Sequence, residues 1–264
     1  MQLSPDQHRE AARAIVDAEG TRRWTEPVSA RWPDADVEDA YGIAVAVRDL
    51  KVAAGHRVAG HKVGLTSKAM RTMFEATEPD YGFLYDDCFV PEGSVVPRER
   101  LNRPLVEQEV AFVMGRHLSG PSANAADVIR ATDFVLPALE IVDSRFRERG
   151  PAMLIDSISD AASCGLVVLG GNPARLTDID VRRISGSLLV NGEIMETGSA
   201  AAVLGNPVNA VAWLANKLHE FGVAMEPGDV ILSGSFVRAV AFDAGDTILA
   251  LFDQLGEVTL TISP

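Results

Sequence analysis

The stretch "RPLVEQEVAFVMG", residues 103–115, places two glutamates two positions apart in a run that is otherwise typical of a buried strand. On a β-strand, residues i and i+2 point to the same face and lie about 6.6–7 Å apart along the chain. Glu107 and Glu109 therefore share one face, while Val106 and Gln108 occupy the other. Two buried carboxylates side by side are costly unless an opposite charge compensates them. The stretch predicts a strand that belongs to a charged site.

A third carboxylate follows in a second apolar run. Glu140 stands in "FVLPALEIVD", residues 134–143, which also has strand character. Three carboxylates on adjacent strands would form an oxygen cage of the kind that Mg²⁺ and Mn²⁺ prefer. The alternative is that the first two glutamates are solvated or pair with arginines such as Arg103 and Arg145.

A lysine and an aspartate are the candidate proton-transfer groups. In "GHKVGLTSKAM", residues 60–70, Lys62 stands between glycines that would allow a ligand to approach the backbone. A lysine in such a pocket can hold a carboxylate, although a solvated surface lysine is the plainer alternative. In "EPDYGFLYDD", residues 78–87, Asp80 precedes a Tyr-Gly turn. We interpret it as a loop acid that could move protons, or else as a turn residue.

Two other polar stretches are less specific. "DSISDAASCG", residues 156–165, contains hydroxyls and acids, and Ser157 or Asp160 is expected to cap a helix there. "LSGSFVRAV", residues 232–240, predicts a small-residue loop whose amides could bind an anion. Arg238 could hold a second carboxylate through two parallel hydrogen bonds, or could be a surface residue after a tight turn.

The composition narrows the class of protein. With 37 acidic against 24 basic residues, the net charge of −13 disfavours nucleic-acid binding. No apolar run approaches the roughly 20 residues that span a bilayer, and we expect no membrane partner. The two cysteines form no CxxC pair, which favours a reduced, cytoplasmic protein. Motifs for a serine nucleophile, a P-loop or a dinucleotide are absent from the sequence.

The pattern along the chain predicts one domain with a helical layer over residues 1–56 and a β-rich core over 57–264. Ser4 caps a helix that ends near residue 20, and Asp36 caps a second one that ends near residue 55. Residues 21–35 read as an irregular connection.

The β-rich part contains one hairpin signal and one helix signal. Asn191-Gly192 between alternating runs predicts a hairpin, and Pro207 to Phe221 predicts an amphipathic helix.

The chain resembles the 2-keto-4-pentenoate hydratase / 4-oxalocrotonate decarboxylase family of the fumarylacetoacetate hydrolase superfamily. The matching stretches follow in the family's order: "GHKVGLTSKAM", "EPDYGFLYDD", "RPLVEQEVAFVMG", "LPALEIVDSR", "NGEIMETG", "NPVNAVAWLANKL" and "GDVILSGSFVRAV". The resemblance implies an α+β fold with a mixed β-roll core, a Mg²⁺ or Mn²⁺ site, and reaction on 2-oxo or 2-hydroxy-dienoates from aromatic meta-cleavage.

The resemblance also assigns roles. It places the metal carboxylates at Glu107, Glu109 and Glu140, the active-site lysine at Lys62, and the catalytic aspartate at Asp80.

One position departs from the family's pattern. Ala161 stands where relatives usually carry Asn, so we expect Ser163 or Asp160 to take over any polar role.

Within the family, "SGSFVRAV" is most similar to the 2-oxohept-4-ene-1,7-dioate hydratases. Ser235, Phe236 and Arg238 of this stretch are therefore expected to bind substrate, and Ser163 is expected to do so in the place of the missing amide. The expected activity is addition of water to a dicarboxylate of this type by a homo-oligomer. The alternatives are 2-keto-4-pentenoate hydration, 4-oxalocrotonate decarboxylation, a catalytically silent partner subunit, and simple metal or acid binding.

Overall fold

Two β-sheets form the centre of the protein. The structure, a computed structural model, describes residues 1–147 and 153–264. The strands of the larger sheet are β1 (Val58–Gly64), β2 (Asp80–Tyr85), β3 (Phe89–Val90), β5 (Leu105–Met114), β6 (Thr132–Val142), β7 (Cys164–Leu169), β10 (Val230–Ser235) and β11 (Val240–Ala241). They follow the order β2-β1-β10-β5-β6-β7-β3, with β11 beside β5. Because β1 runs parallel to β10 and β3 runs parallel to β7, the sheet is mixed.

The smaller sheet has the order β4-β13-β12-β8-β9. Its strands are β4 (Val95–Val96), β8 (Ser185–Val190), β9 (Glu193–Ser199), β12 (Thr247–Phe252) and β13 (Gly256–Ile262). The predicted hairpin is confirmed, because Val190 pairs with Glu193 across Asn191 and Gly192. Both turn residues have a positive φ, 51° and 82°, as a two-residue hairpin turn requires.

The helices are α1 (Pro5–Thr21), α2 (Val28–Arg31), α3 (Val37–Ala53), α4 (Lys68–Met73), α5 (Ala125–Ala131), α6 (Leu154–Ser159) and α7 (Pro207–Glu220). The two predicted N-terminal helices are confirmed, and capping boxes at Ser4 and Asp36 begin them. The expectation of an irregular connection over residues 21–35 was incomplete, because α2 forms within it. No helix in the described ranges is both long and apolar enough to cross a bilayer.

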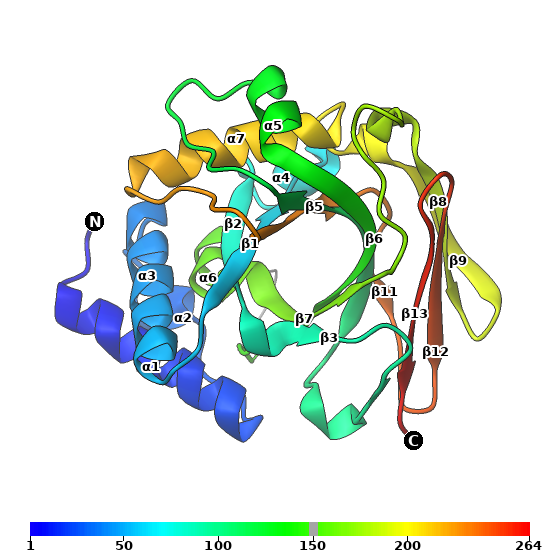
Figure 1. Cartoon of the computed structure of the whole chain (residues 1–264). Coiled ribbons are helices and arrows are strands. Elements are labelled where there is room, and N and C mark those ends of the chain that lie inside the picture. Colours follow the sequence, from blue (N-terminus) through cyan, green and yellow to red (C-terminus); the bar gives the residue numbers. More distant parts are fainter. Residues whose placement is uncertain (148–152) are drawn as a thin grey trace.

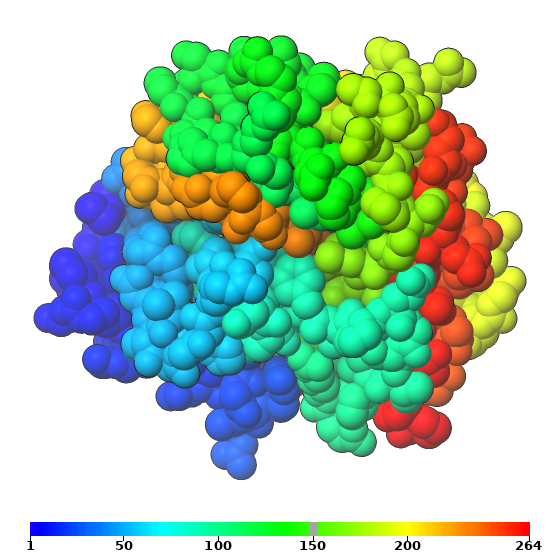
Figure 2. Space-filling view, viewed as in Figure 1, coloured from blue at the N-terminus to red at the C-terminus, as the bar shows by residue number. Residues whose placement is uncertain are grey.

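The elements are arranged in layers around the larger sheet. Figure 1 shows α1 to α3 on one side of this sheet and the smaller sheet on the opposite side, with α5 and α7 across the top. In the space-filling view, the N-terminal helices and the C-terminal strands likewise lie at opposite ends of the molecule (Figure 2). The Gln108 amide joins the two sheets by donating to the Leu251 carbonyl at 2.8 Å. The glutamates that alternate with Gln108 on β5 therefore face away from the smaller sheet.

The larger sheet is strongly curved, and its curvature creates the site. In strand order, β10 and β5 lie between β1 and β6. Nevertheless, the Lys62 Nζ on β1 lies 2.6 Å from the Glu140 carboxylate on β6. Strands in a flat sheet lie about 4.8 Å apart, so side chains three strands apart meet only across the concave face of a curved sheet.

Candidate metal and proton-transfer site

Three carboxylates converge on the concave face. The antiparallel pairing of β5 and β6 places Glu107 opposite Glu140, and Glu109 lies two residues further along β5. One oxygen from each of the three lies within 4.8 Å of the others. Glu109 and Glu140 are buried and Glu107 is half-buried, so solvent reaches this carboxylate cluster from the Glu107 side. The predicted meeting of the three glutamates is therefore seen in the structure.

Lys62 brings a positive charge to the cluster. Its buried ammonium donates to the Glu140 Oε1 at 2.6 Å and to the Ala162 carbonyl at 2.9 Å. The alternative of a surface lysine is wrong at this position. Arg145, which could have paired with the glutamates, instead lies 2.5 Å from Asp160.

The electrostatics of the cluster are those of a site with too much negative charge. Burial raises the pKa of Glu107 to about 7, with Lys62 opposing the shift. Burial and then Glu140 raise the pKa of Glu109 well above its ordinary value. Burial alone would lower the pKa of Lys62, but Glu140 and Glu107 outweigh it and raise the pKa above the ordinary value. One ammonium does not balance the raised pKa values of Glu107 and Glu109, and a further cation would favour the ionised forms of these two carboxyls.

The residues fit a divalent cation. The buried Glu140 Oε2 has no hydrogen-bond partner, while the Glu109 Oε2 accepts from the Gly234 amide at 2.7 Å. The three side chains of the cluster offer oxygen ligands, which suit Mg²⁺ or Mn²⁺. The unpartnered oxygen is the observation that favours a ligand there, since buried polar atoms normally have partners.

These pKa shifts predict how the metal-free protein responds to pH. The pKa of Glu107 is about 7 in the folded protein against 4.5 ordinarily, so the folded state binds more protons between these values. The free energy of unfolding should therefore fall, by roughly 2–3 kcal/mol, as pH rises from about 4.5 to about 7. Urea unfolding with EDTA at several pH values measures this.

Two controls accompany the measurement. Glu107→Gln should reduce the pH dependence and leave the part that comes from the raised pKa values of Glu109 and Asp160, and saturating Mg²⁺ should offset the loss by binding only the folded state. A metal-free stability that rises over this pH range would contradict the electrostatic account of the cluster.

Asp80 is buried in a strand, and the expectation of a loop acid was wrong. It is the first residue of β2 and pairs with Gly64 of β1. Its Oδ2 accepts from the Ser157 hydroxyl at 2.9 Å, and its buried Oδ1 has no partner. Burial raises the pKa of Asp80, while Lys62 and Ser157 oppose the shift. A carboxyl with this environment remains partly protonated at a higher pH than an exposed aspartate, which suits an acid.

The glycine after Lys62 has a different purpose from the one expected. A Cβ added at Gly64 would lie 2.1 Å from the Asp80 Oδ1. The glycine therefore makes room for the Asp80 carboxyl. A glycine within a strand often marks such a close approach. His61, on the other face of β1, is buried against Phe83, and burial lowers its pKa to about 3, consistent with a structural histidine.

Sequence reasoning missed two contributors to the site, the Ser157 hydroxyl and the Ala162 carbonyl. Ser157 and Asp160 were expected to cap a helix, but Ser157 lies inside α6 and donates to Asp80. The Asp160 carboxylate accepts from Ser144 and from the Arg145 amide instead. The Ala162 carbonyl, which accepts from Lys62, carries no sequence signal, because every residue has a carbonyl.

The expected substrate-binding residues do not share one environment. The Ser163 hydroxyl lies 3.4 Å from the Asp160 Oδ2, and the Ser235 hydroxyl donates to backbone carbonyls, including that of Val237 at 2.9 Å. Arg238 is exposed.

Phe236 does not face the carboxylates. Its ring packs against that of Phe252, with centroids 5.9 Å apart, between the two sheets. The assignment of Phe236 to substrate binding stays a prediction.

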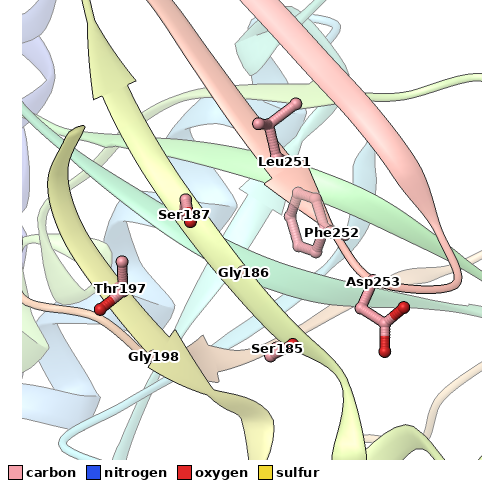
Figure 3. Close-up of a pocket in the computed structure, with 8 residues that line it drawn as sticks. All are labelled: Ser185, Gly186, Ser187, Thr197, Gly198, Leu251, Phe252 and Asp253. Carbon is pink, nitrogen blue, oxygen red and sulfur yellow. The ribbon is translucent and has the colours of Figure 1, made fainter. Parts of the chain in front are cut away.

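A hollow of about 540 Å³ lies elsewhere, on the smaller sheet. Figure 3 shows its lining residues on β8, β9 and the end of β12: Ser185, Gly186, Ser187, Thr197, Gly198, Leu251, Phe252 and Asp253. Asp253 is the one ionisable side chain among them, and none of the predicted site residues takes part. The carboxylate cluster brings three glutamates and a lysine together, whereas the hollow has one ionisable side chain. The cluster is therefore the candidate site.

Known proteins resemble the chain over almost its whole length. It is 42% identical over 257 residues to 2-oxo-hept-4-ene-1,7-dioate hydratase of Escherichia coli, covering 96% of each chain. It is 36% identical over 256 residues to 2-keto-4-pentenoate hydratase of Paraburkholderia xenovorans (strain LB400), covering 97% of this chain and 95% of the relative.

A solved structure shares the fold closely. 4-Oxalocrotonate decarboxylase from Pseudomonas putida G7, complexed with magnesium and adipate, has a TM-score of 0.95 and 36% identity, covering 99% of each chain. Residues 52–263 match the family described as "Fumarylacetoacetate (FAA) hydrolase C-terminal". By sequence and by fold, the chain belongs to the fumarylacetoacetate hydrolase family.

Proposed function

We propose that the protein is a divalent-metal-dependent hydratase that adds water to a 2-hydroxy-dienoate or 2-oxo-enoate diacid of the 2-oxohept-4-ene-1,7-dioate type. The observation that carries the proposal is the convergence of Glu107, Glu109 and Glu140 with a buried ammonium and a buried carboxyl. The similarity to named hydratases at 42% and 36% identity supports this reaction class.

The carboxylate cluster would hold the cation. A bound Mg²⁺ or Mn²⁺ would supply a Lewis acid that polarises the substrate and helps to orient it. Glu107, the half-buried member of the cluster, is the one beside which substrate and water can enter.

Lys62 and Asp80 would handle charge and protons. The ammonium of Lys62, oriented by Glu140 and the Ala162 carbonyl, stabilises the negative charge that grows on the 2-oxygen. Asp80, with its raised pKa and unpartnered Oδ1, delivers a proton to carbon and then takes up a new proton from solvent. Positioned proton transfer of this kind is worth about 10²–10⁴ in rate.

The net reaction balances in two steps. The dienol loses its hydroxyl proton and gains one at C5, which forms the 2-oxo-3-enoate. The oxygen of water then bonds to C4 and a proton is added at C3, giving the 4-hydroxy-2-oxo acid.

Decarboxylation is the second candidate function. The TM-score of 0.95 to a 4-oxalocrotonate decarboxylase favours it specifically. The same groups would stabilise the enolate that remains when CO₂ leaves a 2-oxo diacid.

A single-turnover assay separates these functions. The protein is mixed with 2-hydroxyhepta-2,4-dienedioate and Mg²⁺, the dienol absorbance is followed, and the product is identified by mass. A gain of one water that EDTA abolishes supports the hydratase. Loss of CO₂ from 2-oxo-3-hexenedioate without hydration supports the decarboxylase. Turnover of neither acid overturns both and favours a silent partner subunit.

Arg238 tests the choice of substrate. We propose that this exposed residue pairs with the distal carboxylate of the diacid. Arg238→Gln should then raise the KM for the seven-carbon diacid by about tenfold, because one charge-assisted contact is lost, and leave kcat unchanged. Steady-state kinetics measure both constants.

The five-carbon monoacid 2-hydroxypenta-2,4-dienoate is the matched control substrate, and its KM should not change. An equal effect on the two acids, or no effect on either, would remove Arg238 from the diacid subsite. We further propose that the protein is a cytoplasmic homo-oligomer. Light scattering after size-exclusion chromatography measures its molar mass and so tests the oligomeric state.

A further inference from the structure

A buried arginine lies behind the site without touching the carboxylate cluster. Arg145 is 6% exposed, and its guanidinium donates to the carbonyls of Asp143, Asp160 and Cys164 at 3.2, 2.6 and 2.5 Å. Its Nε also lies 2.5 Å from the Asp160 Oδ1. These contacts join the two ends of the backbone segment that runs from residue 160 to residue 164.

That segment has an unfavourable conformation. Ala161, Ala162 and Ser163 have φ values of 52°, 50° and 59°, so all three residues of this left-handed turn lie in a region that L-residues rarely adopt. None of the three is glycine or asparagine. Within the turn, the Ser163 amide donates to the Asp160 carbonyl at 2.8 Å. A conformation of this kind persists only when its surroundings impose it.

Contacts from both sides impose it. The Asp143 amide donates to the Ser163 carbonyl at 2.8 Å on the side of Arg145. On the other side β2 abuts the turn, and a Cβ added at Gly82 would lie 2.1 Å from the Ala161 carbonyl oxygen. The turn is held between Arg145 and the strand that begins with Asp80.

The left-handed turn contacts and orients Lys62. Its middle residue, Ala162, directs its carbonyl to the Lys62 Nζ at 2.9 Å. We propose that Arg145 is a positioning residue: it holds the left-handed turn so that the Ala162 carbonyl orients the Lys62 ammonium for reaction. The inference rests on the proposed function for the role of Lys62, but not for the geometry of the turn.

Arg145→Lys is the first test. Lysine keeps the positive charge beside Asp160 but lacks the planar group that bonds several carbonyls at once. We expect kcat to fall about 10- to 100-fold, as for other residues that orient an active group, with less than about threefold change in KM. Asn216→Ala is the matched control: it also removes a side chain that holds backbone, at Ala123, and should leave both constants near wild type.

A double-mutant cycle separates positioning from general support of the fold. In a Lys62→Met background, adding Arg145→Lys should lower the remaining kcat by less than about threefold, because residues that act through one another are not additive. Costs that multiply fully would overturn the proposal.

Hydrogen exchange tests the turn without any turnover. In Arg145→Lys with Mg²⁺, the amides of Ser163 and Asp143 should exchange at least about tenfold faster, while amides of β13 keep their rates. Unchanged exchange overturns the proposal. If Arg145→Lys does not fold, Asp160→Asn, which keeps the shape and removes the paired charge, carries the same expectations. If the wild-type chain turns over neither acid, the proposed function fails, and the exchange rates alone decide whether Arg145 holds the turn.

Discussion

Glu140→Gln should lower metal-dependent turnover by about 10³-fold or more. Glutamine keeps the shape of the side chain but removes the charge that pairs with Lys62 at 2.6 Å and faces Glu107 across the strand pair. Loss of a preorganised charge at a reaction centre removes up to about 4 kcal/mol of transition-state stabilisation, and about 4 kcal/mol corresponds to three orders of magnitude in rate. Initial rates with saturating Mg²⁺ measure the effect.

The fold should survive this substitution, because glutamine fits the same volume. Thermal unfolding and circular dichroism check that point, and Mn²⁺ titration followed by electron paramagnetic resonance should show weaker binding. Glu193→Gln, at the exposed start of β9, is the matched control and should behave as wild type. Wild-type turnover in a folded Glu140→Gln protein would exclude the carboxylate cluster as the reaction centre.

Lys62→Met should lower kcat by about 10²–10⁴-fold. Methionine fills much of the same space but donates to neither the Glu140 carboxylate nor the Ala162 carbonyl. The developing charge on the substrate then loses its nearest positively charged donor, and proton transfer loses its orientation.

Lys62→Met should strengthen metal binding, whereas Glu140→Gln should weaken it. Removal of the ammonium takes a positive charge away from the carboxylate cluster, so the same titration with Mn²⁺ should show tighter binding. The matched control is Lys51→Met, which removes another buried lysine, on α3, that pairs with Glu19 and Asp87 and not with the carboxylate cluster. A kcat equal to that of wild type would mean that Lys62 is structural.

Local sequence rules were sufficient where structure depends on near neighbours. The capping boxes at Ser4 and Asp36 mark helix starts, and Asn191-Gly192 marks a hairpin. The alternation of strand residues places Glu107 and Glu109 on one face. The meeting of these two with Glu140 was predictable from the family resemblance, since it depends on strand pairing that alternation alone does not specify.

The sequence was insufficient where a distant segment decides the conformation. Asp80 was assigned to a loop because a Tyr-Gly pair is typical of turns, whereas Gly82 is needed inside β2 so that the Ala161 carbonyl can approach. Beyond Leu232, the pairing of β10 with β5 shifts register before Ser235, so the alternation of residues in the sequence does not give the face on which Phe236 lies.

Nothing in local propensity predicts the left-handed turn either. Alanine disfavours a positive φ, yet Ala161 and Ala162 both have one. The conformation follows from Arg145 and β2, both of which reach the turn through the tertiary fold.

The residues of the site lie on two antiparallel strand pairs, β1–β2 and β5–β6. Lys62 and Asp80 belong to the first pair, and the three glutamates belong to the second. β10 stands between the pairs and touches both. If the proposed roles hold, substitutions in β1 and β2 would alter proton delivery without changing any residue of the carboxylate cluster. Such separability is a structural route by which one ancestral scaffold could diversify into enzymes that hydrate and enzymes that decarboxylate.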